Sequence, residues 1–408
     1  MSKPTAAVQK SLTVGSDGAD WSERPVLFIS EATAFGGHES MALRAAAGLS
    51  RSGVPVGFRF WVGNERLRRA IAAENAQGAS ITLDDSAAAD IRLGSWRTWQ
   101  RGVEIAEARR FLAKDSSFAR VLVQGRIDSG LVTLNAAAEL GLPLISYLPM
   151  AHTLSQMGVG TLPGLRERVL RGLYKKVPAY ITIDPAVERD LRARHARAPI
   201  EVAENWVPAP PTRRPLRASA RARLHLPEAG PTVGTIGRID FRQKGHDHFL
   251  RAMASPPGRE RPLNWLIVGD GPDAAQLRDM ISALGLSNRC HLLPWVEGGM
   301  DEVYAAVDAV VLPSNFEGVP LVMMEALARQ VPVAGSDIDG MAAWLPAFAQ
   351  FDRHQPLQVL EAVSQALDPA HRPAFEPAFA RATAATDVRT FVARWALALQ
   401  SLASAMSR

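Results

Sequence analysis

The chain contains a single cysteine, Cys290, among its 408 residues. One thiol can form neither an internal disulfide framework nor a cysteine-based metal cluster. Cys290 stands where a strand is expected to begin, so we predict a buried side chain that acts as a small apolar residue. This sparing use of cysteine favours a reducing, cytoplasmic setting.

The sequence also lacks a run of about 18 uninterrupted apolar residues, which a membrane-spanning helix needs. Residues 1–20 lack the apolar core of a signal peptide and are expected to form a loose tail. Hydrophobic residues make up 47% of the chain and charged residues 21%, as in globular proteins. The formal net charge of +5 permits anionic partners such as nucleotides, nucleic acid or an acidic membrane surface, without choosing among them.

The length of the chain exceeds one ordinary hydrophobic core, and two domains are expected. In both halves short apolar runs alternate with turns and amphipathic helices, which is typical of parallel α/β layers. Prolines cluster between Val207 and Pro231 and predict a linker there. We predict an N-terminal domain over 21–207, a second domain over 208–380, and a C-terminal helix over 381–408 that returns to the first domain.

The apolar runs also predict the positions of individual strands. No pattern can be assigned between Glu74 and Asp90. The expected strands are Val26–Ser30, Val54–Val62, Val121–Gln124, Leu144–Tyr147 and Tyr180–Ile183, then Thr232–Gly237, Asn264–Val268, His291–Leu293, Ala309–Leu312 and Val331–Ala334.

Ligands of open α/β sheets bind outside the carboxyl ends of the strands, so a site is expected in a cleft between the two domains.

Two cations follow the first strand of the second domain. Gly237-Arg238 stands at the end of that strand, and Lys244 is expected in the loop before the next helix. Together they could clamp a diphosphate, whose charge is costly to bring into a cleft without fixed cations. The alternative is a solvated basic loop. The glycines beside both residues, at a strand-to-helix junction, favour the clamp.

The most informative run extends from Phe316 to Glu325. Pro320 suits the first position of a helix, and the amides of Leu321 and Val322 would then point out of its N-terminus as an anion site. Glu317 and Glu325 lie within reach of one sugar nucleotide, since a helix rises only ~1.5 Å per residue. A carboxylate can accept hydrogen bonds from two hydroxyls of a ribose or hexose. The alternative is a helix-capping glutamate plus a surface glutamate.

These elements resemble one known family in their order and spacing. Gly237-Arg238 and Lys244-Gly245, then the Gly-Asp-Gly-Pro turn at 269–272, then Glu317-Gly318 and Glu325-Ala326, resemble the retaining glycosyltransferases of family four, which belong to the glycosyl transferases group 1. The resemblance covers most of the chain from about Pro25. It implies the GT-B fold, an α/β fold of two Rossmann-like domains with doubly wound parallel sheets that face an interdomain cleft.

The resemblance also implies roles for single residues in binding a nucleoside-diphosphate sugar. Arg238 and Lys244 would hold the diphosphate and stabilise the leaving group, Glu317 would contact the transferred sugar, and Glu325 the ribose. Gly318 and the amides near Leu321 and Val322 would add donor contacts, and Val296 would lie near the base.

In the first domain the resemblance implies two further residues. The Gly-Gly-x-Glu loop that contains Gly37 would close on the donor diphosphate and the acceptor. His152, after the strand Leu144–Tyr147, would line the reaction centre, although a lone histidine is more often a structural or surface residue.

A basic helix is predicted over Leu165–Val177. Leu165, Val169 and Leu173 recur at helical spacing, and the charges around them are mostly basic. Such a helix could rest on an anionic membrane at the inner face of the plasma membrane and meet a lipid-linked acceptor, or it could be a solvated face over an ordinary core stripe.

The resulting prediction is a retaining glycosyltransferase that moves a sugar to a hydroxyl of a glycan or lipid-linked acceptor, in cell-surface polysaccharide or lipopolysaccharide synthesis. No cofactor and no metal are expected, because no Asp-x-Asp motif lies at a suitable strand end. Nucleic-acid binding is not expected, because basic and aromatic residues do not interleave. The alternatives are a nucleotide-sugar epimerase of the same fold and an inactive glycosyltransferase-like scaffold.

Overall fold

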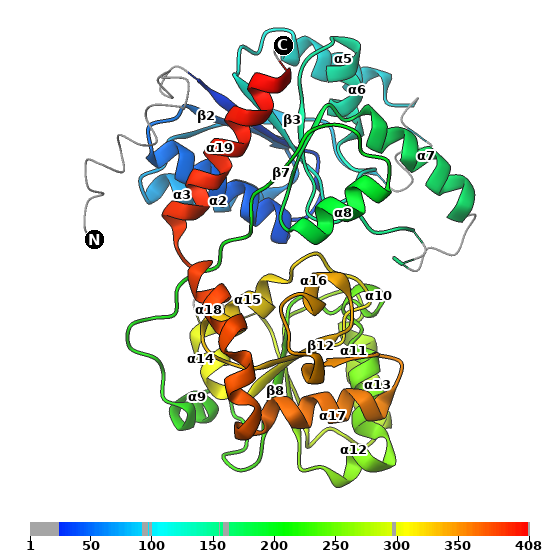
Figure 1. The fold of residues 1–408 in the computed structure, drawn as a ribbon, viewed down its shortest axis with the longest axis vertical. Coiled ribbons are helices and arrows are strands. Elements are labelled where there is room, and N and C mark those ends of the chain that lie inside the picture. Colours follow the sequence, from blue (N-terminus) through cyan, green and yellow to red (C-terminus); the bar gives the residue numbers. More distant parts are fainter. Residues whose placement is uncertain are drawn as a thin grey trace. The chain divides into compact units, whose positions relative to one another are not determined.

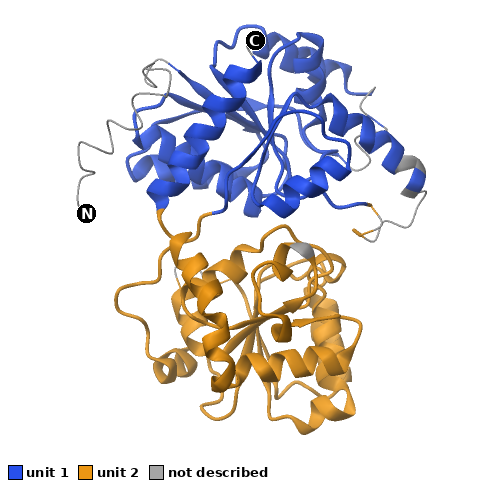
Figure 2. Ribbon diagram, in the orientation of Figure 1, with its two compact units in different colours: residues 1–153, 161–205, 388–408 blue, residues 154–160, 206–387 orange. Residues whose placement is uncertain are grey.

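The computed structural model describes residues 24–91, 97, 100–154, 156–157, 163–295 and 299–406. It divides into two compact units (Figures 1 and 2). Unit 1 comprises the described residues within 1–153, 161–205 and 388–408, and unit 2 those within 154–160 and 206–387. The chain therefore passes from one unit to the other four times along its length.

Unit 1 is built on a seven-stranded sheet of order β3-β2-β1-β4-β5-β6-β7, in which every pair is parallel. All residues of β1 and β4 are buried, because helices cover both faces of a parallel sheet. The strands are β1 (Val26–Ser30), β2 (Val56–Trp61), β3 (Ile81–Ser86), β4 (Ala119–Val123), β5 (Ile145–Tyr147), β6 (Ala179–Thr182) and β7 (Ile200–Val202). The helices are α2 (Gly37–Arg51), α3 (Glu65–Ala76), α5 (Gly102–Leu112), α6 (Leu131–Glu139), α7 (Pro163–Lys176) and α8 (Pro185–Ala193).

The last helix of the chain, α19 (Val388–Met406), belongs to unit 1. Its Trp395 is fully buried, with ring centroids 4.9 Å from Tyr147 and 5.9 Å from Phe28. Arg394 forms an ion pair with Glu204 near the crossing between the units. None of the helices in the described ranges is long and apolar enough to cross a membrane.

Unit 2 has a six-stranded parallel sheet of order β10-β9-β8-β11-β12-β13. The strands are β8 (Thr232–Ile236), β9 (Asn264–Val268), β10 (Cys290–Leu293), β11 (Ala309–Leu312), β12 (Val333–Ser336) and β13 (Gln350–Phe351). The helices are α9 (Arg217–Arg223), α10 (Phe241–Lys244), α11 (His246–Ala254), α12 (Pro256–Glu260), α13 (Ala274–Ala283), α14 (Met300–Ala306), α15 (Leu321–Ala328), α16 (Asp339–Ala342), α17 (Pro356–Leu367) and α18 (Glu376–Ala384), with 3-10 turns at Ala347–Ala349 and Pro369–Phe375. Cys290 is a buried free thiol, as predicted, and burial raises its pKa to about 12.

Two local features differ from the sequence-based expectations. The unassigned stretch between Glu74 and Asp90 contains β3, an edge strand that pairs with one neighbour and whose residues Thr82, Leu83 and Asp85 are exposed. The predicted linker between Val207 and Pro231 contains α9, whose Arg221 is buried and donates to the Ala306 carbonyl at 2.9 Å. The prolines thus mark only the first part of this segment.

Each sheet contains one point where the strand order reverses. In unit 1 this switch point lies between β1 and β4, and in unit 2 between β8 and β11. Helices that follow the two strands of a switch point leave on opposite faces, so a crevice forms outside the carboxyl ends of these strands. The two switch points are therefore the places where a ligand site is expected in each unit.

Candidate functional site

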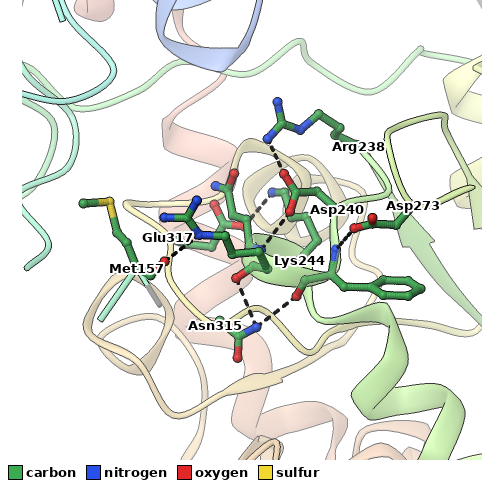
Figure 3. A network of polar contacts seen from close by, with 10 residues as sticks. Met157, Arg238, Asp240, Lys244, Asp273, Asn315 and Glu317 are labelled. Carbon is green, nitrogen blue, oxygen red and sulfur yellow. Dashed lines mark hydrogen bonds and ion pairs between the residues drawn. The ribbon is translucent and has the colours of Figure 1, made fainter. Parts of the chain in front are cut away.

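The switch point of unit 2 brings together three of the predicted donor-binding side chains (Figure 3). Arg238 and Lys244 follow β8, and Glu317 follows β11. Lys244 Nζ lies 2.5 Å from Glu317 Oε1, and the Ser314 hydroxyl donates to the same oxygen at 3.1 Å. The Glu317 side chain is 8% exposed and that of Lys244 22%, so the cation is the more accessible partner.

The two cations differ in their setting. Arg238 is paired with Asp240, and 57% of its side chain is exposed. Asp240 is the N-cap of α10, where its carboxylate accepts the Gln243 amide at 3.2 Å. The prediction that Lys244 lies in a loop is therefore wrong: a capped helical turn forms there, and Lys244 is its last residue. Each cation has a carboxylate neighbour that offsets its charge before an anion binds.

Asn315, which the sequence did not single out, ties the two strand ends together (Figure 3). Its side-chain amide donates to the carbonyls of Phe241 at 3.0 Å and Arg242 at 3.2 Å, and its backbone N–H to the Gln243 carbonyl at 2.7 Å. Asp273, after β9, accepts the Phe241 amide at 2.6 Å. α10 is thus held by hydrogen bonds from two neighbouring loops. These bonds fix the positions of Asp240, which precedes α10, and Lys244, which ends it.

The backbone itself makes close contacts around Lys244. Gly245 has φ 60°, and a Cβ added to it would lie 2.1 Å from the Pro313 carbonyl oxygen. Only glycine allows this left-handed conformation and this approach together. On the other side of α10, Arg242 Nε donates to the Met157 carbonyl at 2.7 Å, which anchors a piece of the segment between β5 and α7 on unit 2 (Figure 3).

In the helix after Glu317, Pro320 does not occupy the first helical position that the sequence predicted for it. Pro320 has ψ 125° and is the N-cap, not the first helical residue, so α15 begins at Leu321. The amides of Leu321 and Val322 therefore lie in the first turn and have no acceptor within the helix. Gly318 lies in the preceding loop, where its carbonyl oxygen would be 1.4 Å from a Cβ on Gly340. This loop is consequently packed tightly against the start of α16.

Glu325 is held by a residue from another helix. The Tyr304 hydroxyl, on α14, donates to Glu325 Oε2 at 2.6 Å. Burial raises the pKa of Glu325, and the Tyr304 hydroxyl and the nearby Arg329 oppose that rise. Arg329 is fixed in turn by an ion pair with Asp301 at 2.7 Å and lies over the Tyr304 ring. One oxygen of Glu325 therefore has a protein donor, and the sequence pattern did not predict that donor.

His246, beside this cluster, is not a further cation. It begins α11 and is 1% exposed. Burial, and then the charge of Lys244, lower its pKa to about 4. The ring is therefore neutral near pH 7 and does not add to the positive charge of Arg238 and Lys244.

The other predicted residues lie elsewhere. Gly37 is the first residue of α2 and not part of a loop, because the preceding Gly36 is the N-cap. His152 lies half-buried in unit 1, five residues after β5. Val296 lies outside the described residues. The roles of Gly37, His152 and Val296 remain predictions.

The sequence profile of the glycosyl transferases group 1 matches residues 217–349, which include this cluster. The D-inositol 3-phosphate glycosyltransferase of Salinispora tropica is 30% identical over 238 residues, which cover 52% of this chain and 48% of that protein. The 2-deoxystreptamine glucosyltransferase of Streptomyces kanamyceticus is 31% identical over 123 residues, 30% of this chain and 32% of that protein. These matches thus span half or less of the relatives' lengths.

The crystal structure of Anabaena Alr3699/HepE in complex with UDP and glucose is similar to both units. Its TM-score is 0.74 at 18% sequence identity, and the match covers 93% of this chain and all of the other. At this identity the similarity shows the fold alone. Two α/β units with parallel sheets of seven and six strands give this chain the GT-B fold.

Proposed function

We propose that this chain is a retaining glycosyltransferase that moves a sugar from a nucleoside-diphosphate sugar to a hydroxyl acceptor. The observation that carries the proposal is the Lys244–Glu317 pair at the switch point of unit 2, beside Arg238 and the first turn of α15. Cations, a buried carboxylate and free helix amides are the groups that a diphosphate and a sugar need side by side. The group 1 profile, which matches this same segment, supports the proposal.

In the proposed reaction the bond between the sugar and the leaving phosphate breaks while negative charge grows on that phosphate. Arg238 and Lys244 neutralise this charge, and the amides of Leu321 and Val322 add fixed dipoles. Glu317 accepts hydrogen bonds from the transferred sugar, and Glu325 from the ribose through the oxygen that Tyr304 does not occupy. The charge is stabilised by groups of the chain itself, and the reaction is proposed to need no metal.

Similar proteins suggest which substrates to try first. A UDP-glucose complex has been solved for HepE, which makes UDP-sugars the first donors. The two relatives are named for D-inositol 3-phosphate and 2-deoxystreptamine, which makes these compounds the first acceptors to try. A lipopolysaccharide core biosynthesis glycosyltransferase of Rhizobium meliloti is another relative, 30% identical over 172 residues (41% of this chain, 46% of that protein). We propose a glycan or lipid-linked acceptor of a cell-surface pathway, reached from the cytoplasmic side.

The test is release of nucleoside diphosphate from UDP-, GDP- and ADP-sugars by the full chain. We expect release from one donor, and a loss of about 10²-fold or more in Lys244→Ala and Glu317→Ala, the size seen when one preorganised charge-stabilising group is removed. Lys114→Ala, an exposed lysine in unit 1, is the matched control and should retain the rate. No release, together with no thermal stabilisation by UDP, GDP or ADP, would favour a scaffold over an enzyme.

The stereochemical part has its own test. The anomeric configuration of the product, read from the sugar proton coupling in NMR, should equal that of the donor. An inverted product would refute retention and leave the donor site intact. Free sugar isomers without transfer would instead indicate an epimerase.

A further inference from the structure

The hydrogen bond that orients Glu325 comes from a helix with little stability of its own. Tyr304, whose hydroxyl donates to Glu325 Oε2, lies on α14, which has seven residues. Gly299 is the N-cap of α14 and supplies no side-chain hydrogen bond to it. A helix this short is not stable in water by itself. The position of Tyr304 therefore depends on the contacts that α14 makes with other elements.

Arg329, the C-cap of α15, supplies several of these contacts. Its Nε and Nη2 lie 2.8 and 2.7 Å from Asp301 Oδ1, in the first turn of α14. Its guanidinium carbon lies 4.9 Å from the centre of the Tyr304 ring, within the range of a cation–π contact. Its Nη1 donates to the backbone carbonyl of Glu325 at 3.1 Å. One guanidinium thus contacts both partners of the Tyr304–Glu325 hydrogen bond.

The burial of Arg329 distinguishes it from a second arginine that pairs with α14. Only 9% of the Arg329 side chain is exposed, whereas Arg223, which pairs with Glu302 at 2.9 Å, is 51% exposed. An exposed ion pair contributes little, because water screens it and both side chains stay mobile. A planar guanidinium with several fixed partners is held in one geometry. Arg329 is therefore the arginine that fixes α14 to the end of α15.

We propose that Arg329 is a positioning residue for the donor ribose and sets a preference for ribonucleotides over 2′-deoxyribonucleotides. The inference rests on the proposed donor site, in which Glu325 accepts hydrogen bonds from ribose hydroxyls. Arg329 acts through Tyr304 and not by contact with the ligand. It holds Tyr304 against Glu325, so the other carboxylate oxygen keeps one orientation. A carboxylate held in this way cannot turn to replace the partner that a deoxyribose lacks, whereas a mobile one can.

Paired nucleotides provide the test. UDP, GDP and ADP are titrated into the full chain by calorimetry, and the tightest binder is compared with its 2′-deoxy form. The unmodified chain should bind the ribonucleotide about tenfold or more tightly, as expected for one hydrogen bond to a charged group. In Arg329→Met, which keeps the apolar stem, this preference should fall about three- to tenfold. The affinity for the deoxyribonucleotide should stay within about twofold, because it lacks the hydroxyl concerned.

Three further variants define the route. Asp301→Asn keeps the side-chain shape and removes the charge that holds Arg329, so it should lower the preference in the same direction. Arg223→Met is the matched control and should leave the preference unchanged. In a Tyr304→Phe chain, Arg329→Met should cause no further fall, because the hydroxyl that it positions is already absent. Thermal unfolding shows whether each variant is folded. If Arg329→Met is not, Asp301→Asn decides, because 37% of the Asp301 side chain is exposed.

A lower preference in Arg329→Met and Asp301→Asn, with the control unchanged, supports the proposal. An unchanged preference in both overturns it, and so does an equal loss of affinity for both nucleotides, which would mark a general structural role. A further fall in the Tyr304→Phe chain would show that Arg329 does not act through Tyr304. If the unmodified chain cleaves a donor but shows no preference, this inference fails and the proposed function stands. If it neither binds nor cleaves any donor nucleotide, the proposed function fails first, and this inference fails with it.

Discussion

Lys244 and Glu317 are 73 residues apart in the sequence and meet as an ion pair of 2.5 Å at the ends of two neighbouring strands. Their strands pair in the centre of the sheet of unit 2, so the contact depends on the sheet order and not on local sequence. The glutamate is the more deeply buried partner. A buried carboxylate that loses its cation keeps the cost of its desolvation.

The first prediction follows from this asymmetry. Lys244→Met should destabilise the chain by about 1–3 kcal/mol, because the buried Glu317 loses the cation that lies against its carboxylate. The double variant Lys244→Met/Glu317→Gln should recover part of the loss. Urea denaturation of the single and double variants measures the coupling. Additive effects of the two substitutions would show that the pair contributes nothing to stability.

The second prediction concerns Tyr304. Tyr304→Phe removes the hydroxyl that donates to Glu325 Oε2 and leaves the ring in place. We expect a weaker affinity for the donor, by about three- to tenfold in KM, because Glu325 loses the bond that orients it towards a ribose. The rate constant kcat at saturating donor should change little, since the leaving phosphate is untouched. A fall in kcat with an unchanged KM would contradict this assignment.

The third prediction concerns pH and Glu31, which follows β1. Its carboxylate accepts the amides of Thr133 at 2.7 Å and Val132 at 3.3 Å at the start of α6. Burial, and then the charge of Asp90, raise its pKa from 4.5 to about 7. The folded chain therefore holds a proton that the unfolded chain releases.

The free energy of unfolding should therefore fall as the pH rises. The stability that this group contributes is fully present below pH 4.5 and is lost as the pH rises to about 7. The difference in pKa corresponds to about 3 kcal/mol. Glu31→Gln should remove this slope, so that the unfolding free energy of the variant falls less than that of the unmodified chain between these limits. Parallel curves for both proteins would refute the raised pKa.

The fourth prediction concerns α7. Of the expected apolar stripe, Val169 is 36% exposed and Leu173 half-buried, and the Leu165 side chain lies outside the described part of the structure. The core is filled instead by Leu170, Tyr174 and Val177. Apolar side chains thus remain at the surface among basic ones, namely Arg168, Arg171, Lys175 and Lys176.

We propose that this face of α7 binds anionic membranes. The chain should sediment with phosphatidylglycerol vesicles at low salt and much less with phosphatidylcholine vesicles. Arg171→Glu/Lys175→Glu should lower that binding about tenfold or more, since each basic residue contributes about 1 kcal/mol at an anionic surface. Arg189→Glu, an exposed residue on α8, is the control. If Arg171→Glu/Lys175→Glu sediments with the vesicles as strongly as Arg189→Glu does, this face of α7 does not contact the membrane.

The central strands could be predicted from the sequence because they are buried on both faces. β1, β9 and β11 have the predicted bounds, since a continuous apolar run between turns is a local signal. The edge strand β3 was missed, because the adjacent Asp84 and Asp85 interrupt its apolar residues and half of the strand is exposed, so no continuous apolar run marks it. The short helix α10 was missed for a different reason: one capping aspartate and contacts from distant loops stabilise it, not a periodic pattern.

By itself, the sequence determined the α/β class and the residues that follow β8 and β11, because strand periodicity, helix caps and strand ends are encoded locally. The tertiary structure decided which of these residues meet. Lys244 with Glu317, Tyr304 with Glu325, and Arg329 with Asp301 are contacts between elements whose neighbourhood depends on sheet order and packing. No local pattern specifies such pairs, since each partner lies on a separate element.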